Sequence, residues 1–271
     1  MTNGLRDALD AMVYAHRRGA RLVLLFDYDG TLVPIAPRPE LAVLDRVTRR
    51  RLDRLARLPD VVVGVLSGRT LEALKAMVGL DHLYYAGTSG LELDLRGDSM
   101  VHPDSGRAGR LIVAVARRMQ SALAGYEGAW LEQKPLGLTV HYRDASRAQI
   151  EDLRDAVAHV VRAFADGLKM SDGPMAIEIV PNLGWSKRSA LATIVRRVHA
   201  DTVVPLYAGD DANDAGPLDA ADTLGGVAIG IGARAPQSAR YRLPDPDSLG
   251  RCLDELTDML QTDAQRAATF R

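Results

Sequence analysis

The chain has 271 residues and a formal net charge of −1, with 34 basic and 35 acidic side chains, which excludes the strongly basic surface of most nucleic-acid-binding proteins. Hydrophobic residues make up 47%, enough for an ordinary core in one large domain or two small ones. The single cysteine excludes an internal disulfide, and no apolar run reaches membrane-spanning length. We therefore expect a cytoplasmic protein, a monomer, that binds neither membranes nor nucleic acid.

Along the first part of the chain, helical patterns alternate with buried strands. Apolar residues at helical spacing predict helices over residues 3–19, 40–58 and 70–78, the last capped by Thr70. Apolar runs predict strands over residues 23–26, 61–66 and 83–87, followed by a half-exposed strand over 91–95. The polar stretch 97–105 is interpreted as a loop, which ends the first segment of a core domain, residues 1–104.

The middle of the chain has a different pattern. It predicts helices over residues 109–123 and 146–165, and short strands over residues 129–134, 138–142, 168–170 and 175–180. The order helix, two strands, helix, two strands favours a small antiparallel sheet with helices on one face. We therefore expect a separate α+β domain over residues 105–182, inserted into the core.

The core resumes over residues 183–271. A helix is predicted from Ser186, its capping residue, to His199, followed by strands over 203–208 and 227–231 and a final helix over 248–260. Buried strands that alternate with helices indicate a mainly parallel sheet with helices on both faces. The predicted core is therefore a doubly wound, Rossmann-like α/β fold.

Two carboxylates one residue apart, Asp27 and Asp29, follow the first buried strand. Residues i and i+2 of an extended chain share a face, and open α/β sheets bind ligands at the carboxyl ends of their strands. Like charges that close repel unless a cation or a proton relieves them. The pair predicts a Mg²⁺ site, a nucleophile beside a general acid, or both; the alternative is a solvated acidic turn. Gly30 lets the backbone turn and its amide approach a ligand, and Thr31 adds a hydroxyl.

A second strand also ends in polar residues, the sequence Ser67-Gly68-Arg69 at the start of a helix. A hydroxyl placed at the end of a strand and the N-terminus of a helix is an arrangement that binds phosphate. The alternative is an ordinary capped turn. We therefore treat Ser67 as a candidate phosphate ligand, together with Gly68 and Arg69.

A third cluster of oxygen ligands follows the strand predicted over residues 203–208. Asp210 and Asp211 are adjacent, and Asp214 lies on the next helical turn. Carboxylate oxygens are the ligands that Mg²⁺ prefers in proteins. The alternative is an acidic cap at the N-terminus of a helix.

The segment 27–32, Asp-Tyr-Asp-Gly-Thr-Leu, resembles the first motif of the haloacid dehalogenase superfamily of phosphotransferases. The resemblance implies that Asp27 is the nucleophile and forms an aspartyl-phosphate. It implies that Asp29 protonates the leaving oxygen and then activates water. Three later positions match the superfamily's other motifs in order and spacing: Ser67, Lys187 and the pair Asp210 and Asp214.

The chemistry of a phosphomonoester fits these residues. Its transition state spreads negative charge over the equatorial oxygens, so catalysis needs positioning and positive charge. We expect Mg²⁺ to be held by Asp27, the backbone carbonyl of Asp29 and Asp210, with Asp214 ligating through water or orienting Lys187. Lys187 and Ser67 are expected to hold the phosphoryl group. Five neighbours are expected to help bind substrate: Gly30, Thr31, Gly68, Arg69 and Asp211.

Within the superfamily, the chain resembles the trehalose-6-phosphate phosphatase family. The resemblance is carried by residues 83–92, 132–143 and 177–181, and the inserted domain matches the family's C2-type cap. In that family the matching Glu, Lys, Arg and Glu bond the disaccharide hydroxyls, which implies this role for Glu132, Lys134, Arg143 and Glu178. The alternative for these four is surface ion pairs on a small sheet. The implied enzyme is a Mg²⁺-dependent phosphatase of trehalose biosynthesis that hydrolyses trehalose 6-phosphate, a small-molecule sugar phosphate.

Four positions depart from the family pattern. Asn213 and Ala215 replace the usual Thr and Glu around Asp214, which does not threaten catalysis because Asn213 is common in related sugar phosphatases. Ser89 stands where the family usually has His, and Arg188 replaces the Gly after the motif lysine. Both are candidates for lining the entrance for the phosphate or the sugar. The alternative substrate is therefore another sugar phosphate, such as sucrose phosphate, glucosylglycerol phosphate or an aminosugar phosphate. A catalytically silent sugar-sensing module is a hypothesis of another class, against which the intact motif residues argue.

Overall fold

Two units make up the fold. One holds the residues up to Met100 together with those from Ser186 onward, and the other is Val101–Trp185, slightly longer at both ends than the predicted 105–182. The structure is a computed structural model that describes residues 3–164, 167–173 and 175–269, with side chains described only as far as residue 262. Within these ranges, no helix is both long enough and apolar enough to cross a membrane.

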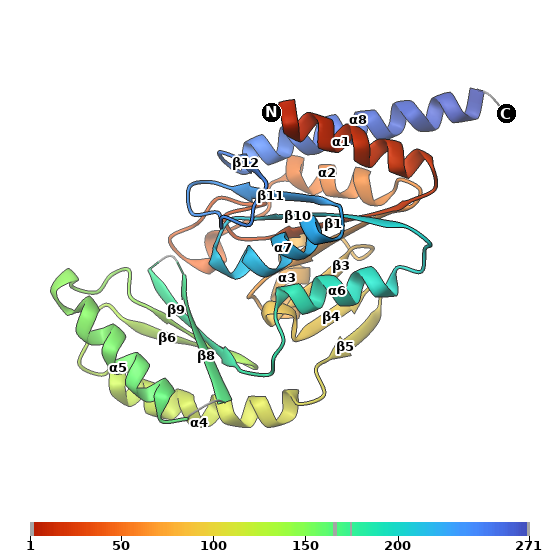
Figure 1. The fold of residues 1–271 in the computed structure, drawn as a ribbon. Coiled ribbons are helices and arrows are strands. Elements are labelled where there is room, and N and C mark those ends of the chain that lie inside the picture. The colour runs from red at the N-terminus through yellow and green to blue at the C-terminus, as the bar shows by residue number, and fades with distance from the viewer. Residues whose placement is uncertain (1–2, 165–166, 174, 270–271) are drawn as a thin grey trace. The chain divides into compact units, whose positions relative to one another are not determined.

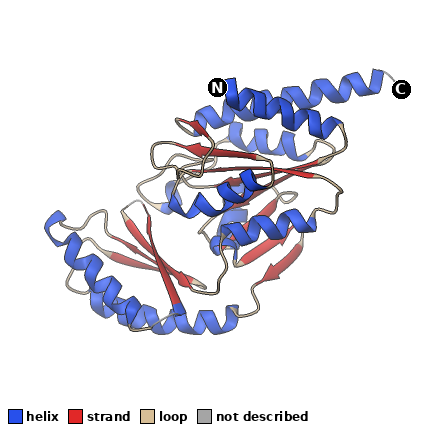
Figure 2. Ribbon diagram, viewed as in Figure 1, coloured by secondary structure: helices blue, strands red, loops and turns tan. Residues whose placement is uncertain are grey.

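An eight-stranded sheet organises the first unit, in the order β12-β11-β10-β1-β2-β3-β4-β5 (Figures 1 and 2). The strands are β1 Arg21–Asp27, β2 Val61–Leu66, β3 Tyr84–Gly87, β4 Glu92–Leu95, β5 Asp98–Val101, β10 Val203–Gly209, β11 Val227–Ile231 and β12 Tyr241–Leu243. Neighbours from β12 to β3 are parallel, and β4 runs antiparallel to β3. Because β1 lies between β10 and β2, the carboxyl ends of these three strands meet at one edge.

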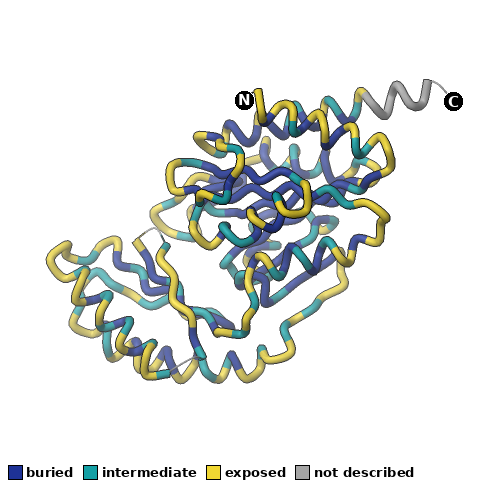
Figure 3. The backbone as a smooth tube through the Cα atoms, in the orientation of Figure 1, coloured by how far each residue is buried: buried dark blue, intermediate teal, exposed yellow. Residues whose placement is uncertain are grey.

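Helices cover both faces of this sheet. One face carries α1 Asn3–Arg17, α2 Arg46–Ala56, α3 Leu71–Val78 and α8 Pro246–Thr269, and the other carries α6 Lys187–Arg197 and α7 Ala215–Thr223. Side chains alternate along β1, so that Leu24 and Phe26 pack in the first layer and Val23 and Leu25 in the second. The strand is therefore buried on both faces (Figure 3). This confirms the predicted mainly parallel, doubly wound core.

The second unit is a four-stranded antiparallel sheet with two helices on one face, as predicted (Figure 1). Its strands, in the order β6-β7-β9-β8, are β6 Trp130–Lys134, β7 Gly137–His141, β8 Leu168–Gly173 and β9 Ala176–Pro181. Its helices are α4 Ser105–Leu123 and α5 Ile150–Arg162. Alternate strand residues such as Val140 and Ile177 pack with Ile112 and Leu153 of the helices. The opposite face of the sheet carries the polar side chains.

The helix predicted over residues 40–58 is wrong at its start. Only a single 3₁₀ turn, η1 Pro39–Leu41, forms in this region, and α2 begins after Asp45. The Asp45 carboxylate caps α2 by accepting the amides of Val47 at 2.7 Å and Thr48 at 3.0 Å. An aspartate that satisfies two helical amides fixes the start of the helix there.

The polar stretch predicted as a loop over residues 97–105 contains the edge strand β5. Arg96 and Gly97 have φ angles of +59° and +94°, and two such residues in a row form the tight turns of β-hairpins. The chain therefore reverses, and β5 pairs with β4. β4 is also more buried than predicted, because its Asp94 carboxylate, 4% exposed, forms an ion pair with Lys75.

Other element boundaries also differ from the prediction. α4 begins four residues before the predicted start at 109, and β8 continues to Gly173 rather than ending at 170. The helix predicted over 146–165 is a 3₁₀ turn, η3 Arg147–Gln149, followed by α5, and its predicted last residue lies outside the described residues. The short strand β12 was not predicted, since three residues are too few to show a period.

Candidate active site

The end of β1 places Asp27 in a buried position and turns the next residue away. Asp27 is 5% exposed, while the Tyr28 hydroxyl donates to the carbonyl of Ala42 at 2.8 Å on the other side of the strand. The chain then turns at Gly30, which has a φ of +87°. A Cβ at Gly30 would lie 2.2 Å from Oδ2 of Asp210, so only glycine lets this loop pass so close to that carboxylate.

The Gly30 amide, expected to approach a ligand, has a partner within its own loop. This amide donates to the carbonyl of Val33 at 2.8 Å and so closes the turn rather than facing a ligand. The Thr31 hydroxyl oxygen, in contrast, is buried without a hydrogen-bond partner among the described residues. Because buried polar atoms are nearly always satisfied, Thr31 is the better candidate for a ligand contact in this loop.

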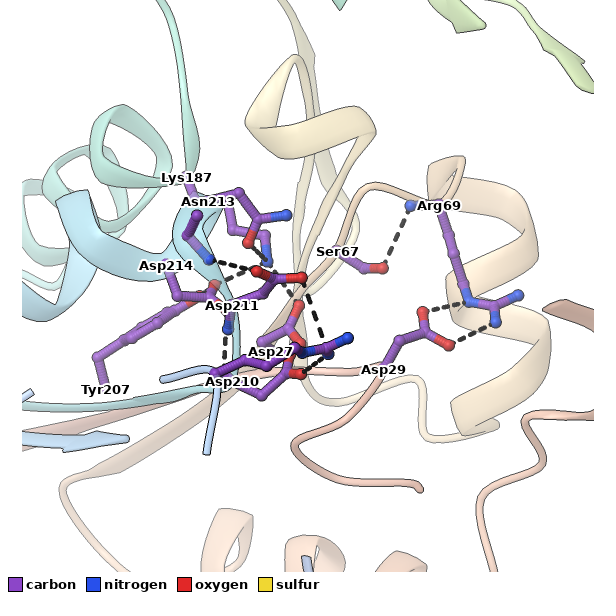
Figure 4. Close-up of polar contacts among 12 residues, drawn as sticks. Asp27, Asp29, Ser67, Arg69, Lys187, Tyr207, Asp210, Asp211, Asn213 and Asp214 are labelled. Carbon is purple, nitrogen blue, oxygen red and sulfur yellow. Dashed lines mark hydrogen bonds and ion pairs between the residues drawn. The ribbon is translucent and has the colours of Figure 1, made fainter. Parts of the chain in front are cut away.

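The end of β10 contributes a second pair of buried carboxylates. Asp214 is 0% exposed, and its Oδ2 accepts the amides of Asp210 at 3.1 Å and Asp211 at 3.3 Å. Its Oδ1 accepts the hydroxyl of Tyr207 at 2.7 Å (Figure 4). Gly209 lets Asp214 fold back onto the strand, since a Cβ there would lie 2.4 Å from its carboxylate carbon. Asp214 is therefore held rigidly behind Asp210.

Lys187, the first residue of α6, joins these two strand ends. Its side chain is 3% exposed, and its Nζ donates to Asp27 Oδ1 at 2.5 Å, to Asp214 Oδ1 at 2.8 Å and to Asn213 Oδ1 at 3.2 Å (Figure 4). These three acceptors match the three N–H groups of a lysine ammonium. Ser186 stands at the predicted N-cap position, but its side chain makes no capping hydrogen bond.

The cluster carries more negative than positive charge. Burial raises the pKa of Asp27 well above its ordinary value, and the neighbouring Asp214 and Asp210 raise it further against the opposing effect of Lys187. Burial also raises the pKa of Asp210, to about 6. Burial alone lowers the pKa of Lys187, but Asp214 and Asp27 outweigh it, so that pKa is raised and the ammonium stays charged. A further cation is the simplest way to relieve the remaining repulsion.

The carboxylates fit a divalent metal ion of the Mg²⁺ type. One oxygen each from Asp27, Asp210 and Asp214 lies within 4.8 Å of the others, and all three residues are buried. Oxygen-only donor sets with few protein carboxylates suit Mg²⁺. Asp214 already accepts four hydrogen bonds, including the one from Lys187. Asp27 and Asp210 are therefore the better ligands, and Asp214 orients Lys187.

Asp29 lies apart from this cluster in the structure. Its two oxygens accept Nε and Nη2 of Arg69 at 2.7 and 2.6 Å (Figure 4). Nη2 of Arg69 also donates to the carbonyl of Pro39 at 2.8 Å. Arg69, which we expected to bind substrate, thus links the segment Ser67-Gly68-Arg69 to Asp29 of the first motif. Ser67 is 2% exposed, and its hydroxyl oxygen accepts the Arg69 amide at 3.2 Å.

One charged neighbour of the cluster was not predicted. Arg234, in the loop after β11, donates from Nη2 to Asp210 Oδ2 at 2.6 Å and lies 3.7 Å from Asp211 Oδ2. Its side chain is 44% exposed, so it reaches the buried carboxylate from the surface. No local pattern in the sequence marks this arginine, since it lies outside the recognised motifs.

The structure also shows the contacts of Ser89 and Arg188, two of the positions that depart from the family pattern. Ser89, with a φ of +55°, donates its amide to the carbonyl of Ser67 at 2.9 Å, so it lies beside the predicted phosphate ligand. Arg188 forms an ion pair with Asp219 of α7 and donates to the carbonyl of Gly216 at 3.4 Å. Ser89 therefore remains a candidate for the entrance, whereas Arg188 bonds the surface of α7.

In the second unit, three predicted sugar ligands lie on the sheet face opposite the helices. Glu132 and Glu178 are both in register with Thr139 of β7, on strands to either side of it. Lys134 donates to the Thr139 hydroxyl at 3.1 Å and lies 3.8 Å from Glu132. The fourth predicted ligand, Arg143, is exposed in the turn that follows β7.

An aromatic pair on the same face was missed by sequence reasoning. The rings of Trp130 and His141 stack with centroids 3.9 Å apart, and His141 Nε2 lies 2.9 Å from Glu132 Oε2. Trp130 is 45% exposed, unusual for so large an apolar side chain. The alternating pattern of β6 places Trp130, Glu132 and Lys134 on one face, a signal that could have identified the pair.

Solved structures share the fold. The C-terminal domain of the Candida albicans trehalose-6-phosphate phosphatase is 20% identical, with a TM-score of 0.79 over 92% of this chain and 96% of that one. A haloacid dehalogenase-like hydrolase from Bacteroides thetaiotaomicron is 14% identical, with a TM-score of 0.62 over 88% of this chain and 99% of that one. These likenesses show that the chain has the fold of a trehalose-6-phosphate phosphatase domain and of a haloacid dehalogenase-like hydrolase.

The family is shown by sequence. The chain belongs to the trehalose-phosphatase family, whose model matches residues 25–247. A trehalose-phosphate phosphatase from Mycobacterium marinum is 32% identical over 256 residues, covering 89% of this chain and 63% of that protein. One from Mycobacterium tuberculosis H37Rv is 33% identical over 277 residues, covering 97% of this chain and 68% of that protein. The chain thus spans about two thirds of the length of these relatives.

Proposed function

We propose that this protein is a Mg²⁺-dependent phosphatase that hydrolyses trehalose 6-phosphate to trehalose and inorganic phosphate. The observation that carries the proposal is the buried network at the carboxyl ends of β1 and β10. There Lys187 holds Asp27 and Asp214 together, with Asp210 beside them. Membership of the trehalose-phosphatase family supports the substrate. Such a network supplies a nucleophile, a metal site and a fixed positive charge, the parts that phosphoryl transfer requires.

The reaction begins at Asp27. A carboxylate oxygen of Asp27 attacks phosphorus in line, the bond from phosphorus to the sugar oxygen breaks, and an aspartyl-phosphate forms. The leaving sugar oxygen takes a proton from Asp29. Asp29 then removes a proton from a water molecule whose oxygen attacks phosphorus, which releases inorganic phosphate and restores Asp27. A bound Mg²⁺, held by Asp27 and Asp210, would supply charge neutralisation for the phosphoryl oxygens.

Lys187, Ser67 and Thr31 position the reacting groups. The three bonds of Lys187 fix the Asp27 carboxylate, and a phosphoryl oxygen can replace Asn213, the most distant of the three acceptors. The Thr31 hydroxyl has no partner among the described residues and donates to a second phosphoryl oxygen. The buried Ser67 hydroxyl donates to a third. Each oxygen of the transferred group then meets a protein donor.

Asp29 serves as the acid only after it leaves Arg69 and takes up a proton from solvent, to which its side chain is 38% exposed. In the structure the guanidinium holds the carboxylate in two hydrogen bonds, a resting pair that stabilises the charged form. Arg69 also bonds the Pro39 carbonyl, so it stays in place when Asp29 rotates. We assign Arg69 the role of positioning Asp29, in place of the direct substrate contact expected from the sequence.

The polar face of the second unit supplies sugar selectivity. Glu132, Lys134 and Glu178 offer charged hydrogen-bonding groups along one row, and Arg143 follows at the end of β7. The exposed Trp130 adds an apolar ring face, against which the C–H face of a sugar can pack. Such a combination of an aromatic plane with charged acceptors and donors suits a disaccharide better than a bare phosphate.

A panel of phosphate esters tests this function. The expected result is Mg²⁺-dependent release of phosphate, fastest from trehalose 6-phosphate. The comparison substrates are sucrose phosphate, glucosylglycerol phosphate, an aminosugar phosphate and glucose 6-phosphate. They are included because Ser89 stands where the family usually has His. Preference for one of these would refute the trehalose assignment while leaving the phosphatase chemistry. No turnover of any ester, including an aryl phosphate with Mg²⁺, would refute both.

A further inference from the structure

An open hollow in the first unit lies away from the carboxylate cluster. Its volume is about 640 Å³, within the range of small-molecule sites, and four arginines line it: Arg49, Arg50, Arg57 and Arg96. Arg49 and Arg50 come from the middle of α2, and Arg57 follows that helix just before β2. Arg96 follows β4, beside the start of its antiparallel neighbour β3. The hollow is therefore at the amino ends of β2 and β3, the sheet edge opposite to Asp27.

One of the two acidic residues in this lining is already neutralised. Asp53 accepts two hydrogen bonds from Nε of Arg57, each 3.0 Å long. His82 Nε2 lies 3.0 Å from the same carboxylate, an ion-pair distance, although the contact lacks hydrogen-bond geometry. The other acidic residue that lines the hollow, Asp81, is exposed.

The other three arginines have no carboxylate partner among the described residues. Arg49 makes one long bond, 3.4 Å, to the carbonyl of Met77, and its Nε is buried without a partner in the described part of the chain. Arg96 donates Nε to the carbonyl of His82 at 2.8 Å and lies over the ring of Tyr84. These contacts orient the two guanidinium groups but leave their charge uncompensated.

The rest of α2 shows that this arrangement is not simply a solvated basic helix. Arg51, from the same run of three arginines, bonds Asp254 of α8 at 2.8 Å, and Arg54 reaches Asp258 of α8 at 3.4 Å. Arginines on that side of the helix thus have acidic partners. Among the described residues, only the side of α2 that faces the hollow carries arginines without an acidic partner.

We propose that this hollow binds a small phosphorylated anion. Guanidinium groups bind phosphate through paired, charge-assisted hydrogen bonds, and the hollow is lined by three arginines without a carboxylate partner among the described residues and by one exposed carboxylate, Asp81. The volume exceeds that of a single phosphate and suits a phosphorylated metabolite. None of the residues assigned to phosphoryl transfer lines the hollow, so this site does not rest on the proposed catalytic function.

Isothermal titration of the full chain with inorganic pyrophosphate, in chelator and without Mg²⁺, tests the proposal. We expect one site in the wild type and at least about tenfold weaker binding in the double variant Arg49→Gln/Arg96→Gln, because each change removes a charge-assisted bond. Arg46→Gln is the matched control. It removes the same charge from the exposed first residue of α2, outside the hollow, and should bind like wild type. Turnover of an aryl phosphate should be the same in all three proteins.

Four results would overturn the proposal. No binding by the wild type, or equal binding by the double variant, would show that pyrophosphate does not use these arginines. An equal loss in Arg46→Gln would show attraction to general positive charge. Citrate bound more tightly than pyrophosphate, and lost in the double variant, would assign the hollow to polycarboxylates instead. As a second measurement, pyrophosphate should raise the midpoint temperature of thermal unfolding in wild type and not in the double variant. A cooperative unfolding transition in the double variant also shows that this variant is folded.

Discussion

Asp27 and Lys187 lie 160 positions apart in the sequence yet form a 2.5 Å bond that is almost completely buried. Burying one ammonium and three carboxylates is unfavourable unless every group has partners, because charge is poorly solvated in the protein interior. Here the partners are supplied by Tyr207, Asn213 and two backbone amides around Asp214. At the scale of single residues, these partners make the burial of the charges tolerable, and the proposed phosphoryl chemistry would account for why charged groups are buried here.

The first prediction is that Asp27→Asn abolishes turnover while the fold persists. An amide is a poor nucleophile and a weaker metal ligand, but its oxygen can still accept the Lys187 hydrogen bond. Phosphate release should fall to background with an unchanged circular dichroism spectrum, and beryllofluoride with Mg²⁺ should attach to wild type only. Asp201→Asn, at an exposed position, is the control and should keep full activity. Substantial residual turnover in purified Asp27→Asn would remove Asp27 from the nucleophile role.

The second prediction concerns the space beside Asp210. Gly30→Ala should greatly reduce turnover and weaken the response to Mg²⁺, because the new Cβ would lie 2.2 Å from Asp210 Oδ2 and must displace it. Gly97→Ala is a matched control: its φ of +94° is similarly unfavourable for alanine, but no atom lies within 4 Å of the added Cβ. Both variants should lose some stability in urea, and only Gly30→Ala should lose activity. Equal activity in the two would show that this close approach is unimportant.

Asp45 shows at the scale of elements how one polar side chain sets a boundary that apolar spacing misplaces. The pattern of leucines runs through residues 40–58, but the carboxylate of Asp45 satisfies the amides of Val47 and Thr48 and begins the helix there. The sequence contained this signal, an Asp three positions before a Thr at the start of a basic segment. Capping chemistry was therefore better evidence than periodicity for the start of α2.

The third prediction is that Asp45→Ala destabilises the protein by about 1 kcal/mol at neutral pH, the usual effect of losing an N-cap. Burial acts to raise the pKa of Asp45, but the hydrogen bonds from Thr48 and Val47 outweigh it and lower that pKa. A lowered folded-state pKa stabilises the fold above the unfolded value, and this contribution disappears as the pH falls through the folded value. Urea unfolding should therefore show a smaller difference between wild type and variant in acid than at pH 7. Asp45→Asn, which can still cap, should lose less at pH 7.

For the molecule as a whole, the sequence could predict those parts of the site that the topology of a parallel sheet brings together. Asp27 and Asp210 each follow a buried strand, and adjacent parallel strands bring their carboxyl ends together without any knowledge of side-chain contacts. The pairing of Asp29 with Arg69 and of Asp210 with Arg234 depends instead on how separate loops pack. No local pattern encodes such contacts, so sequence reasoning assigned Arg69 to substrate and overlooked Arg234.

The last prediction tests whether side chains of the second unit determine which sugar phosphate is hydrolysed. Under the proposed function, the carboxylate cluster binds only a phosphoryl group and a metal ion, so we expect sugar selectivity to come from groups such as Lys134 and Arg143 in the second unit. A site built to hydrogen-bond hydroxyls loses heavily when one charged partner is removed. Lys134→Ala and Arg143→Ala should each cost trehalose 6-phosphate turnover about 2–4 kcal/mol in kcat/KM, yet leave aryl phosphate turnover nearly unchanged. Arg117→Ala, exposed on α4, is the control and should change neither. Equal losses on both substrates would mean that these residues support the fold or the phosphoryl chemistry instead of the sugar.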